Sequence, residues 1–502
     1  MRNGIKILIS IFFCVTSLCV QGQVNEKKNW QHLDLEKDGV FGISADKLYQ
    51  QLNGKKGVPV IVAVIDGGAD TSHEDLKGMF WSNPKEIPGN KKDDDKNGYV
   101  DDIHGWNFLG SAKGSFLLDN YDLIRQLRSA LKKDPNSQQA RDLQAQVAEK
   151  KAYYEKALAE VTQERESLNA ILTGVGKPNP SVNDLQNFRY KSAEQEEELV
   201  KLVKALNAKS DPDTFKDNLN RQYSDDKEQL DYWLNINYDP RKDKEFTKPG
   251  YGNGDIQGQV PYHCTHVSGI IAANRNNNLG GKGIADNVKL MILRTIPVGD
   301  YLDSEMALAI RYAADNGARV INISAGKIGA VHPELIDQAV QYAMDKDVLI
   351  VHACGNDGQH LDQGYYPRKE YQSGGKAKAW IEVGASGMKD DESLMFLASN
   401  YGKKVVDVFA PGVDIYSCTP NNGYAYLNGT SMAAPVVSGL AAVLRSYYPK
   451  LSAETIKEII IGSVKKVNHN IKTINGTIPF SETCSSGGIV NLYDAFELAA
   501  KR

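Results

Sequence analysis

The chain has no marked excess of charge of either sign. Its 502 residues include 59 lysines and arginines against 63 aspartates and glutamates, and the formal net charge is −4. This balance gives no general attraction to nucleic acid or to an anionic membrane surface, so we expect no nucleic-acid partner. Hydrophobic residues make up 41% of the chain and charged residues 24%, which is typical of a globular protein of one to three domains. The composition does not indicate an oligomeric state.

Long apolar runs are also scarce. The one candidate, Ile7 to Val20, follows Arg2 and Lys6 and is short for a membrane span. A basic start, an apolar stretch and small residues near Gly22 are typical of a secretion signal. We therefore predict a signal peptide over residues 1–22, cleaved near Gly22, and a mature chain without a stable membrane span. Such a chain would be exported to a periplasm, a cell surface or the medium.

Cysteine is rare, and two of the six cysteines lie in the predicted signal. The other four are Cys264, Cys354, Cys418 and Cys484. Four thiols in an exported protein allow two disulfides in three connectivities, and the spacing does not choose among them. The spacing also fits no zinc-binding pattern.

Glycine is nearly absent from residue 119 to Gly174, where alanine, glutamine, leucine and charged residues dominate. Apolar residues recur every seven positions, which predicts a long helix packed against others; they are Val147, Tyr154, Val161 and Leu168. A break near 174–180 suggests a helical hairpin. We predict a helical insert over residues 119–235, which divides a catalytic domain into parts at 23–118 and 236–502.

Outside the insert, short apolar runs alternate with helical patterns. The strands are expected at 58–66, 288–296, 320–324, 348–354, 380–385 and 405–410, and helices at 44–52, 304–316, 333–346, 431–447, 453–461 and 492–501. This alternation predicts an α/β fold: a doubly wound, mostly parallel sheet with helices on both faces.

Polar residues follow these elements where α/β folds place functional groups. Asp66 and Asn356 each come at the end of an apolar strand, and Ser431 begins an apolar helix. Taken singly, each has a plainer explanation as a capping or turn residue. Together with a base they could support acyl transfer, because a serine needs an imidazole to take its proton.

Two histidines, His263 and His266, lie three residues apart at the start of a small-residue helix. They could be metal ligands on one helical face, as in a zinc hydrolase, but a third ligand at helical spacing is missing. His263 can instead serve as the base for Ser431, with Asp66 fixing its tautomer and Asn356 donating to an oxyanion.

An acidic run at residues 93–102 resembles the first half of a calcium loop. Its twelfth position is His104 instead of a bidentate glutamate, and a solvated acidic turn is the alternative. The predicted structural Ca²⁺ ligands are Asp93, Asp95, Asn97, the carbonyl of Tyr99, and Asp101. No cofactor is expected for catalysis.

Several blocks, in order along the chain, resemble the subtilisin-like serine proteases, or subtilases (peptidase family S8). They are Asp66-Gly67-Gly68, the run from His263 to Gly269, Asn322 to Gly326, Ala353 to Gly358, Ser399 to Gly402, Ala410 to Gly412, and Gly429 to Pro435. The resemblance covers roughly 58–108 and 250–502. Any one block is weak evidence, but the ordered set is specific.

The resemblance implies a secreted serine endopeptidase that acts on proteins or peptides through an acyl-enzyme intermediate. It implies Asp66 as orienting acid, His263 as general base, Ser431 as nucleophile and Asn356 as oxyanion donor. It also implies that Ser324, Ala325 and Gly326 pair with the substrate backbone. Gly355 would line the pocket for the residue before the scissile bond.

This chain departs from the family pattern in two places. Cys264 stands where the family usually has glycine, and Cys354 lies near the predicted oxyanion amide, so a disulfide or sensitivity to thiol reagents is a further expectation. The helical insert greatly lengthens the acid-to-base separation, and it could cap the site or assist folding. A binding module with an inactive subtilase fold, using the insert for partner contact, is the alternative function.

Overall fold

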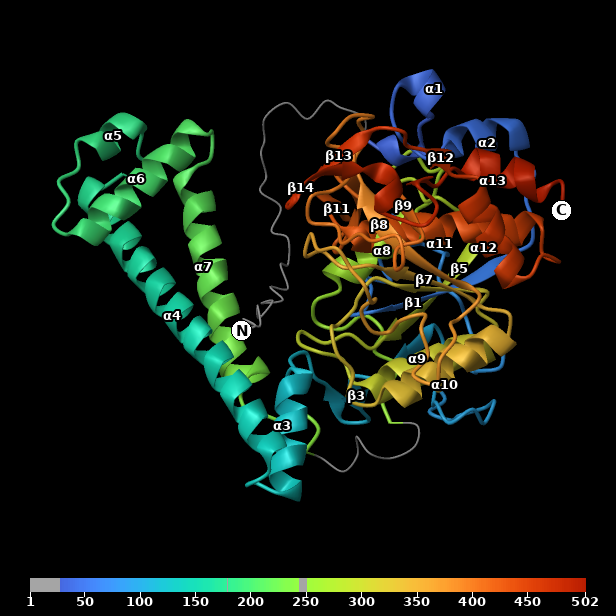
Figure 1. Cartoon of the computed structure of the whole chain (residues 1–502), viewed down its shortest axis with the longest axis horizontal. Coiled ribbons are helices and arrows are strands. Elements are labelled where there is room, and N and C mark those ends of the chain that lie inside the picture. The colour runs from blue at the N-terminus through green and yellow to red at the C-terminus, as the bar shows by residue number, and fades with distance from the viewer. Residues whose placement is uncertain (1–27, 178, 243–250) are drawn as a thin grey trace, which may run out of the picture.

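The computed structural model describes residues 28–177, 179–242 and 251–502, so the predicted signal peptide lies outside the described residues. Figure 1 shows a rounded body built on a central sheet, and a helical arm that extends away from it. The body confirms the predicted α/β class with helices on both faces of a mostly parallel sheet.

The central sheet has nine strands, and all neighbours run parallel except the β12–β15 pair at one edge. Its order is β12 (Lys465–Lys466), β15 (Gly488–Ile489), β9 (Val408–Pro411), β8 (Trp380–Ser386), β7 (Leu349–Ala353), β6 (Val320–Ile323), β1 (Val60–Asp66), β5 (Val288–Arg294) and β2 (Gly105–Asn107). The central strands are apolar runs because both of their faces are covered.

Successive side chains of β1 enter opposite faces of the sheet. Val62 and Val64 join one core cluster, whereas Ala63 and Ile65 join the other. The first face is covered by α2 (Ala45–Leu52), α8 (Tyr262–Ala272), α11 (Thr430–Tyr447), α12 (Ala453–Gly462) and α13 (Leu492–Ala499). The second is covered by α9 (Asp303–Asp315) and α10 (Pro333–Asp345).

The strand order reverses at β1, which lies between β5 and β6. Chain segments therefore leave its carboxyl end in two directions and open a crevice there. Asp66 is the last residue of β1 and lies at this crevice.

The body also contains several short helices and hairpins. They are η1 (Trp30–His32), α1 (Leu35–Asp38), η2 (Glu74–Leu76), the β3–β4 hairpin (Gly110–Ser111, Gly114–Ser115), the β10–β11 hairpin (Ile415–Thr419, Gly423–Leu427), the β13–β14 hairpin (Asn470–Thr473, Gly476–Pro479) and η5 (Phe480–Glu482). None of the hairpins was among the elements expected from the sequence.

The arm contains α3 (Asp122–Lys133), α4 (Gln138–Val175), α5 (Val182–Gln186), α6 (Ala193–Asn207), α7 (Pro212–Glu228) and a π-helical turn, η3 (Gln229–Trp233). All four members of the seven-residue repeat are buried along α4. α4 ends at Val175, and the following Gly176 adopts a left-handed conformation. The arm has a proximal core around Leu127 and Leu143 and a separate distal core around Leu168 and Leu202.

Buried ion pairs between side chains connect the root of the arm to the body. Lys327 directly follows the segment Ser324–Gly326 and is 7% exposed. Its Nζ contacts the Asp122 carboxylate at the start of α3, and it lies 2.7 Å from Asp303 Oδ1 at the start of α9. Breaking such a buried pair leaves an uncompensated charge, which costs about 3–5 kcal/mol. The arm is therefore joined to the body by buried ion pairs next to the predicted substrate segment.

Candidate active site

Asp66 is held at the end of β1 by the turn that follows it. The Gly67 N–H donates to Asp66 Oδ1 at 2.6 Å, and the side chain is 5% exposed. Gly68 has a φ of +115°, and a Cβ there would lie 2.3 Å from the Gln257 carbonyl oxygen. Only glycine allows this close approach, which keeps the carboxylate at the crevice.

His263 is the second residue of α8, and its ring faces Asp66. Nδ1 lies 2.9 Å from Asp66 Oδ2 and 3.1 Å from Oδ1. Because a carboxylate only accepts hydrogen bonds, Nδ1 carries the proton and Nε2 keeps its lone pair. No described residue bonds to Nε2, and the side chain is 43% exposed.

The pKa of His263 is set by two opposing effects. Desolvation by the surrounding protein lowers this pKa, but the charge and the hydrogen bond of Asp66 raise it by more in combination. The net pKa is therefore above the ordinary histidine value of 6.5.

Ser431 is the second residue of α11, which packs against α8. Its Oγ donates to the carbonyl oxygen of Ser324 at 3.1 Å, and Ser324 Oγ donates back to the Ser431 carbonyl at 2.9 Å. The preceding Gly429 has a φ of +146°, which favours glycine, and its N–H donates to the Gly412 carbonyl at 2.7 Å. Ser431, the candidate nucleophile, is thus joined to the predicted substrate segment by two hydrogen bonds.

Asn356 lies in the loop after β7 and is oriented by Thr430. Its Oδ1 accepts from the Thr430 N–H at 2.9 Å and from Thr430 Oγ1 at 3.0 Å. The amide Nδ2, which can only donate, has no acceptor among the described residues. It is therefore available to an oxyanion beside Ser431.

The loop that carries Asn356 is shaped by Asn400, which is fully buried. Its Nδ2 donates to the Cys354 carbonyl at 3.0 Å, and its Oδ1 accepts from the N–H groups of Asp357 and Gln359. Gly355 has a φ of +99°, and a Cβ there would lie 2.5 Å from Asn400 Nδ2. Sequence reasoning assigned no role to Asn400 or Thr430, although both lie in blocks that carried the family resemblance.

His266 takes no part in this arrangement. It is fully buried, and its Nε2 lies 3.1 Å from the carbonyl oxygen of Ala425. Burial lowers its pKa to about 3, so the ring stays neutral. Because His263 faces Asp66 and His266 faces Ala425, the two rings do not converge on a metal ion.

All four cysteines outside the predicted signal are free and buried, so the possible disulfide between Cys264 and Cys354 is not formed. Burial raises the pKa of both of these thiols well above the ordinary value, and for Cys264 the Asp66 charge adds to this effect. A buried thiol with a raised pKa presents little thiolate to a reagent. The structure therefore opposes the expected sensitivity to thiol reagents.

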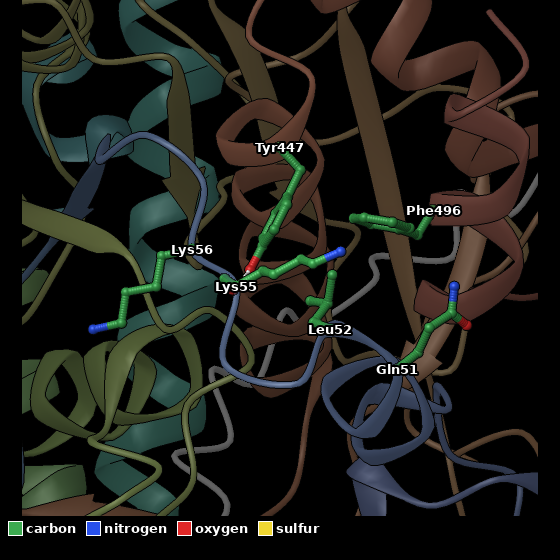
Figure 2. A pocket seen from close by; sticks show the side chains of 6 residues that line it. All are labelled: Gln51, Leu52, Lys55, Lys56, Tyr447 and Phe496. Atoms are coloured by element: carbon green, nitrogen blue, oxygen red, sulfur yellow. Dashed lines mark hydrogen bonds between the residues drawn. The ribbon is translucent and has the colours of Figure 1, made fainter.

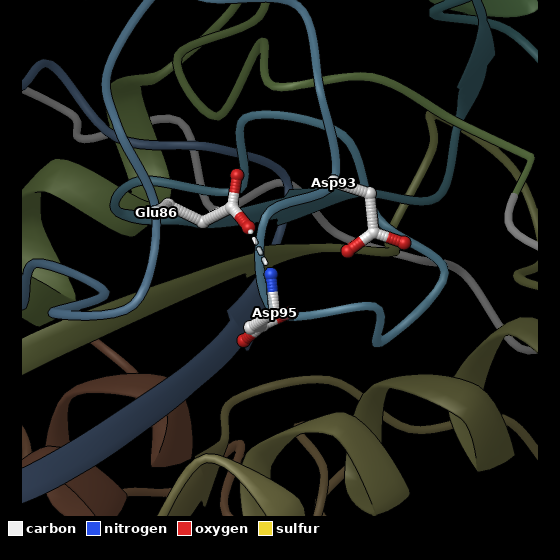
Figure 3. Close-up of side chains that lie close together, drawn as sticks. All are labelled: Glu86, Asp93 and Asp95. Atoms are coloured by element: carbon white, nitrogen blue, oxygen red, sulfur yellow. Dashed lines mark hydrogen bonds between the residues drawn. The ribbon is translucent and has the colours of Figure 1, made fainter.

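The acidic loop brings part of the predicted calcium set together. The carboxylates of Asp93 and Asp95 converge with that of Glu86, which sequence reasoning missed, with one oxygen of each within 4.8 Å of the others. Figure 3 shows these side chains close together, with the Asp95 backbone N–H donating to the Glu86 carboxylate at 3.1 Å. Among the described residues, no other group of three or more His, Cys, Asp or Glu side chains converges in this way.

Two of the remaining predicted ligands, Asp101 and Asn97, accept hydrogen bonds from nearby backbone N–H groups. Asp101 accepts from the N–H groups of Gly89 and Lys91 at 2.9 and 2.8 Å. Asn97 Oδ1 accepts from the Tyr99 N–H at 2.8 Å, which closes a local turn. The structure therefore centres the acidic site on Glu86, Asp93 and Asp95.

A separate surface hollow of about 540 Å³ lies at the far end of α11 (Figure 2). It is lined by Gln51, Leu52, Lys55, Lys56, Tyr447 and Phe496. Tyr447 is 16 residues after Ser431 on the same helix, roughly 24 Å along the axis. The hollow is therefore not part of the candidate site.

The fold and this set of side chains define a class, the α/β serine hydrolases with an acid, an imidazole, a serine and an amide donor. The particular family follows from comparison with known proteins. A model of the Subtilase family matches residues 57–477, which is most of the chain. The chain belongs to the subtilase family of serine peptidases.

Individual relatives agree with this assignment. Thermitase of Thermoactinomyces vulgaris is 38% identical over 221 residues, which are 44% of this chain and 70% of that protein. The thermophilic serine proteinase of Bacillus sp. (strain AK1) is 42% identical over 185 residues, 37% of this chain and 42% of that protein. This match spans less than half the length of the Bacillus protein.

A solved structure of a protease from Pseudoalteromonas arctica is 26% identical, with a TM-score of 0.41, over 51% of this chain and 80% of that one.

Proposed function

We propose that this protein is an exported serine endopeptidase that hydrolyses peptide bonds through an acyl-enzyme intermediate on Ser431. The observation that carries the proposal is the Asp66–His263 pair, in which Nδ1 is engaged at 2.9 Å and Nε2 is left as a base. The family assignment supports a peptide substrate. The arrangement of the site gives no support to the inactive binding module, because each of the four required positions holds a competent group.

In the proposed mechanism, His263 Nε2 takes the proton from Ser431 Oγ as this oxygen attacks the substrate carbonyl. Asp66 stabilises the imidazolium that forms. Asn356 Nδ2 and the Ser431 backbone N–H donate to the developing oxyanion. The imidazolium then protonates the leaving amine. Water next attacks the acyl-enzyme in the same way, with His263 as base, and the carboxylic acid product leaves Ser431.

The substrate would bind as an extended strand along Ser324–Gly326. The N–H and C=O of Gly326 have no partner among the described residues, so they can extend pairing to a peptide backbone. Gly355 would flank the side chain before the scissile bond. Export is supported only by the sequence of residues 1–22, and no described helix is both long and apolar enough to cross a membrane.

We also propose that Glu86, Asp93 and Asp95 hold a structural calcium ion. Carboxylate oxygens are the ligands that Ca²⁺ prefers, and three of them converge here. The ion would join the loop at residue 86 to the loop at residues 93–95. It takes no part in the chemistry at Ser431.

The proposed activity is tested by labelling the purified mature protein with a fluorophosphonate probe beside Ser431→Ala. Labelling of the wild type alone is the expected result, because only an activated serine reacts with the probe. The test is repeated with added calcium and after removal of the insert. Absence of labelling in every arm, with the protein folded, would overturn the proposal in favour of the binding module.

A further inference from the structure

A fully buried histidine and glutamate lie beneath the proposed substrate segment. His352 on β7 and Glu382 on β8 are directly paired in the sheet register, and they are 0% and 1% exposed. His352 Nδ1 lies 2.8 Å from Glu382 Oε1. On the other side of the ring, His352 Nε2 lies 2.9 Å from the carbonyl oxygen of Ala325. The proposed mechanism uses neither side chain.

The hydrogen-bond partners determine how many protons this pair holds. A carbonyl oxygen can only accept, so His352 Nε2 carries a proton toward Ala325. Glu382 Oε2 accepts at 2.9 Å from the indole N–H of Trp380, which can only donate. One further proton must lie between Nδ1 and Oε1, because a bare nitrogen facing a carboxylate would be repelled. The pair is therefore neutral overall and shares one proton.

The His352–Glu382 pair fixes the carbonyl of Ala325, the middle residue of the proposed substrate segment Ser324–Gly326. Ser324 is fastened on the opposite side by its two hydrogen bonds with Ser431. Backbone groups of successive residues in an extended strand point in opposite directions. The Ala325 carbonyl is bound by His352, whereas the N–H and C=O of Gly326 have no partner among the described residues.

We propose that His352, held by the shared proton with Glu382, is a positioning residue that sets the register of Ser324–Gly326 for an extended peptide. The inference rests on the proposed function and deepens it. It predicts that the enzyme reads the peptide backbone on the amino-terminal side of the scissile bond. Substrates too short to reach Gly326 should not benefit from the pair.

The test compares an extended peptide amide with a single-residue ester of the same acyl residue. In His352→Leu, kcat/KM for the extended peptide should fall about five- to tenfold, mainly through KM, as expected for one lost hydrogen bond. The single-residue ester and the rate of fluorophosphonate labelling should change by less than twofold. Equal losses on both substrates, or no loss on either, would overturn the inference.

Substitution of Glu382 tests the shared proton. In Glu382→Gln, the new amide can donate to Nδ1 and accept from Trp380, so His352 still donates to Ala325. We expect this variant to keep the wild-type preference for the extended peptide, whereas Glu382→Leu should lose it. Loss of the preference in both variants would show that charge is required and would overturn the shared-proton assignment.

A measurement on unsubstituted His352 covers the case in which a variant does not fold. Imidazole ¹⁵N spectra of folded Ser431→Ala protein should show protonated Nε2 for His352, with a resonance that shifts when an extended peptide binds. A bare Nε2 would overturn the inference. If the wild-type protein neither reacts with the fluorophosphonate probe nor cleaves peptides, the proposed function itself is wrong. This result is distinguishable from failure of the inference about His352.

Discussion

His263 has one strong electrostatic neighbour, and this neighbour sets the pH range in which the site can work. Asp66 raises the pKa of His263 above 6.5 in spite of desolvation. In the proposed mechanism His263 must be neutral to accept a proton from Ser431, so we expect protonation to remove activity. The same shift favours folding at low pH, and that contribution is lost as pH rises through the folded pKa.

The pH dependence of activity should follow from this shift. We expect kcat/KM of the wild type to fall as pH decreases through a pKa above 6.5, the ordinary histidine value. A pH–rate profile in constant ionic strength measures it. An acid limb centred well below 6.5 would contradict the assignment of His263 as the base paired with Asp66.

Tyr365 occupies space beside the proposed substrate position. A Cβ on Gly326 would lie 3.3 Å from Tyr365 Cβ, and one on Gly355 would lie 2.9 Å from Tyr365 Cε2. The ring is held by a 2.8 Å hydrogen bond from its hydroxyl to Asp357. The side chain therefore fills room between the two segments that would flank the residue before the scissile bond.

We expect the wild type to prefer a small residue at that substrate position. Tyr365→Ala should raise kcat/KM for phenylalanine relative to alanine there by about 10- to 100-fold, because a larger apolar side chain gains contacts. Tyr365→Phe keeps the ring and serves as the matched control. A series of peptide substrates that differ only at this residue gives the measurement; an unchanged ratio in Tyr365→Ala would place the pocket elsewhere.

At the scale of elements, the sequence predicted the strands and helices whose apolar residues form a pattern that burial requires. The strand predicted at 320–324 forms at Val320–Ile323, and the helix predicted at 333–346 forms at Pro333–Asp345. The β10–β11 hairpin was missed because β11 is only partly buried and does not form an apolar run. The turn signal was present, since Asn421 and Asn422 both adopt positive φ before Gly423, as a tight hairpin requires.

The acidic loop contains two features that the sequence could not predict. Alternating oxygen side chains indicated the cation site, but the direction of Asp101 depends on backbone N–H groups at residues 89 and 91. Glu86 lies outside the repeating pattern and enters the site only through tertiary structure. A one-dimensional spacing cannot encode either feature.

Calcium should stabilise the protein through this loop. Added Ca²⁺ is expected to raise the melting temperature, and Asp93→Asn or Glu86→Gln should remove most of that increase. Asp101→Asn is the matched control: it changes the same charge in the same loop but should leave the calcium-dependent part of the increase intact. Differential scanning calorimetry with and without chelator measures it. Loss of the calcium response in Asp93→Asn and Asp101→Asn, but not in Glu86→Gln, would restore the ligand set predicted from the sequence.

At the scale of the whole molecule, the helical arm divides into a root and a distal part. The root is joined to the body through Lys327 and Asp122, and also through Arg241, which contacts Glu305 at 2.8 Å. The distal core makes its contacts within the arm, and Figure 1 shows this part standing away from the body. The two proposed roles of the insert, in folding and in capping, can thus be tested separately.

We expect truncation of the distal arm to be tolerated. Replacing residues 161–223 by a short glycine–serine linker should preserve folding and fluorophosphonate labelling, because the proximal core and the ion pairs of the root remain. Deleting residues 119–235 should lower the folded yield, since Lys327 loses Asp122 in a buried site. Cleavage of a folded protein substrate and of a peptide by each variant measures any capping role. Equal behaviour of the two deletions would contradict the division.

The four proposed catalytic side chains come from positions 66, 263, 356 and 431, which lie on β1, on α8, in the loop after β7 and on α11. In the proposed mechanism, a fragment that stops short of α11 lacks the nucleophile, and a fragment that lacks β1 cannot orient the base. On this proposal, a nascent chain is expected to be inactive throughout its synthesis. Hydrolytic activity of the proposed enzyme would arise only once the tertiary structure is complete, so the topology would protect the producing cell during biosynthesis.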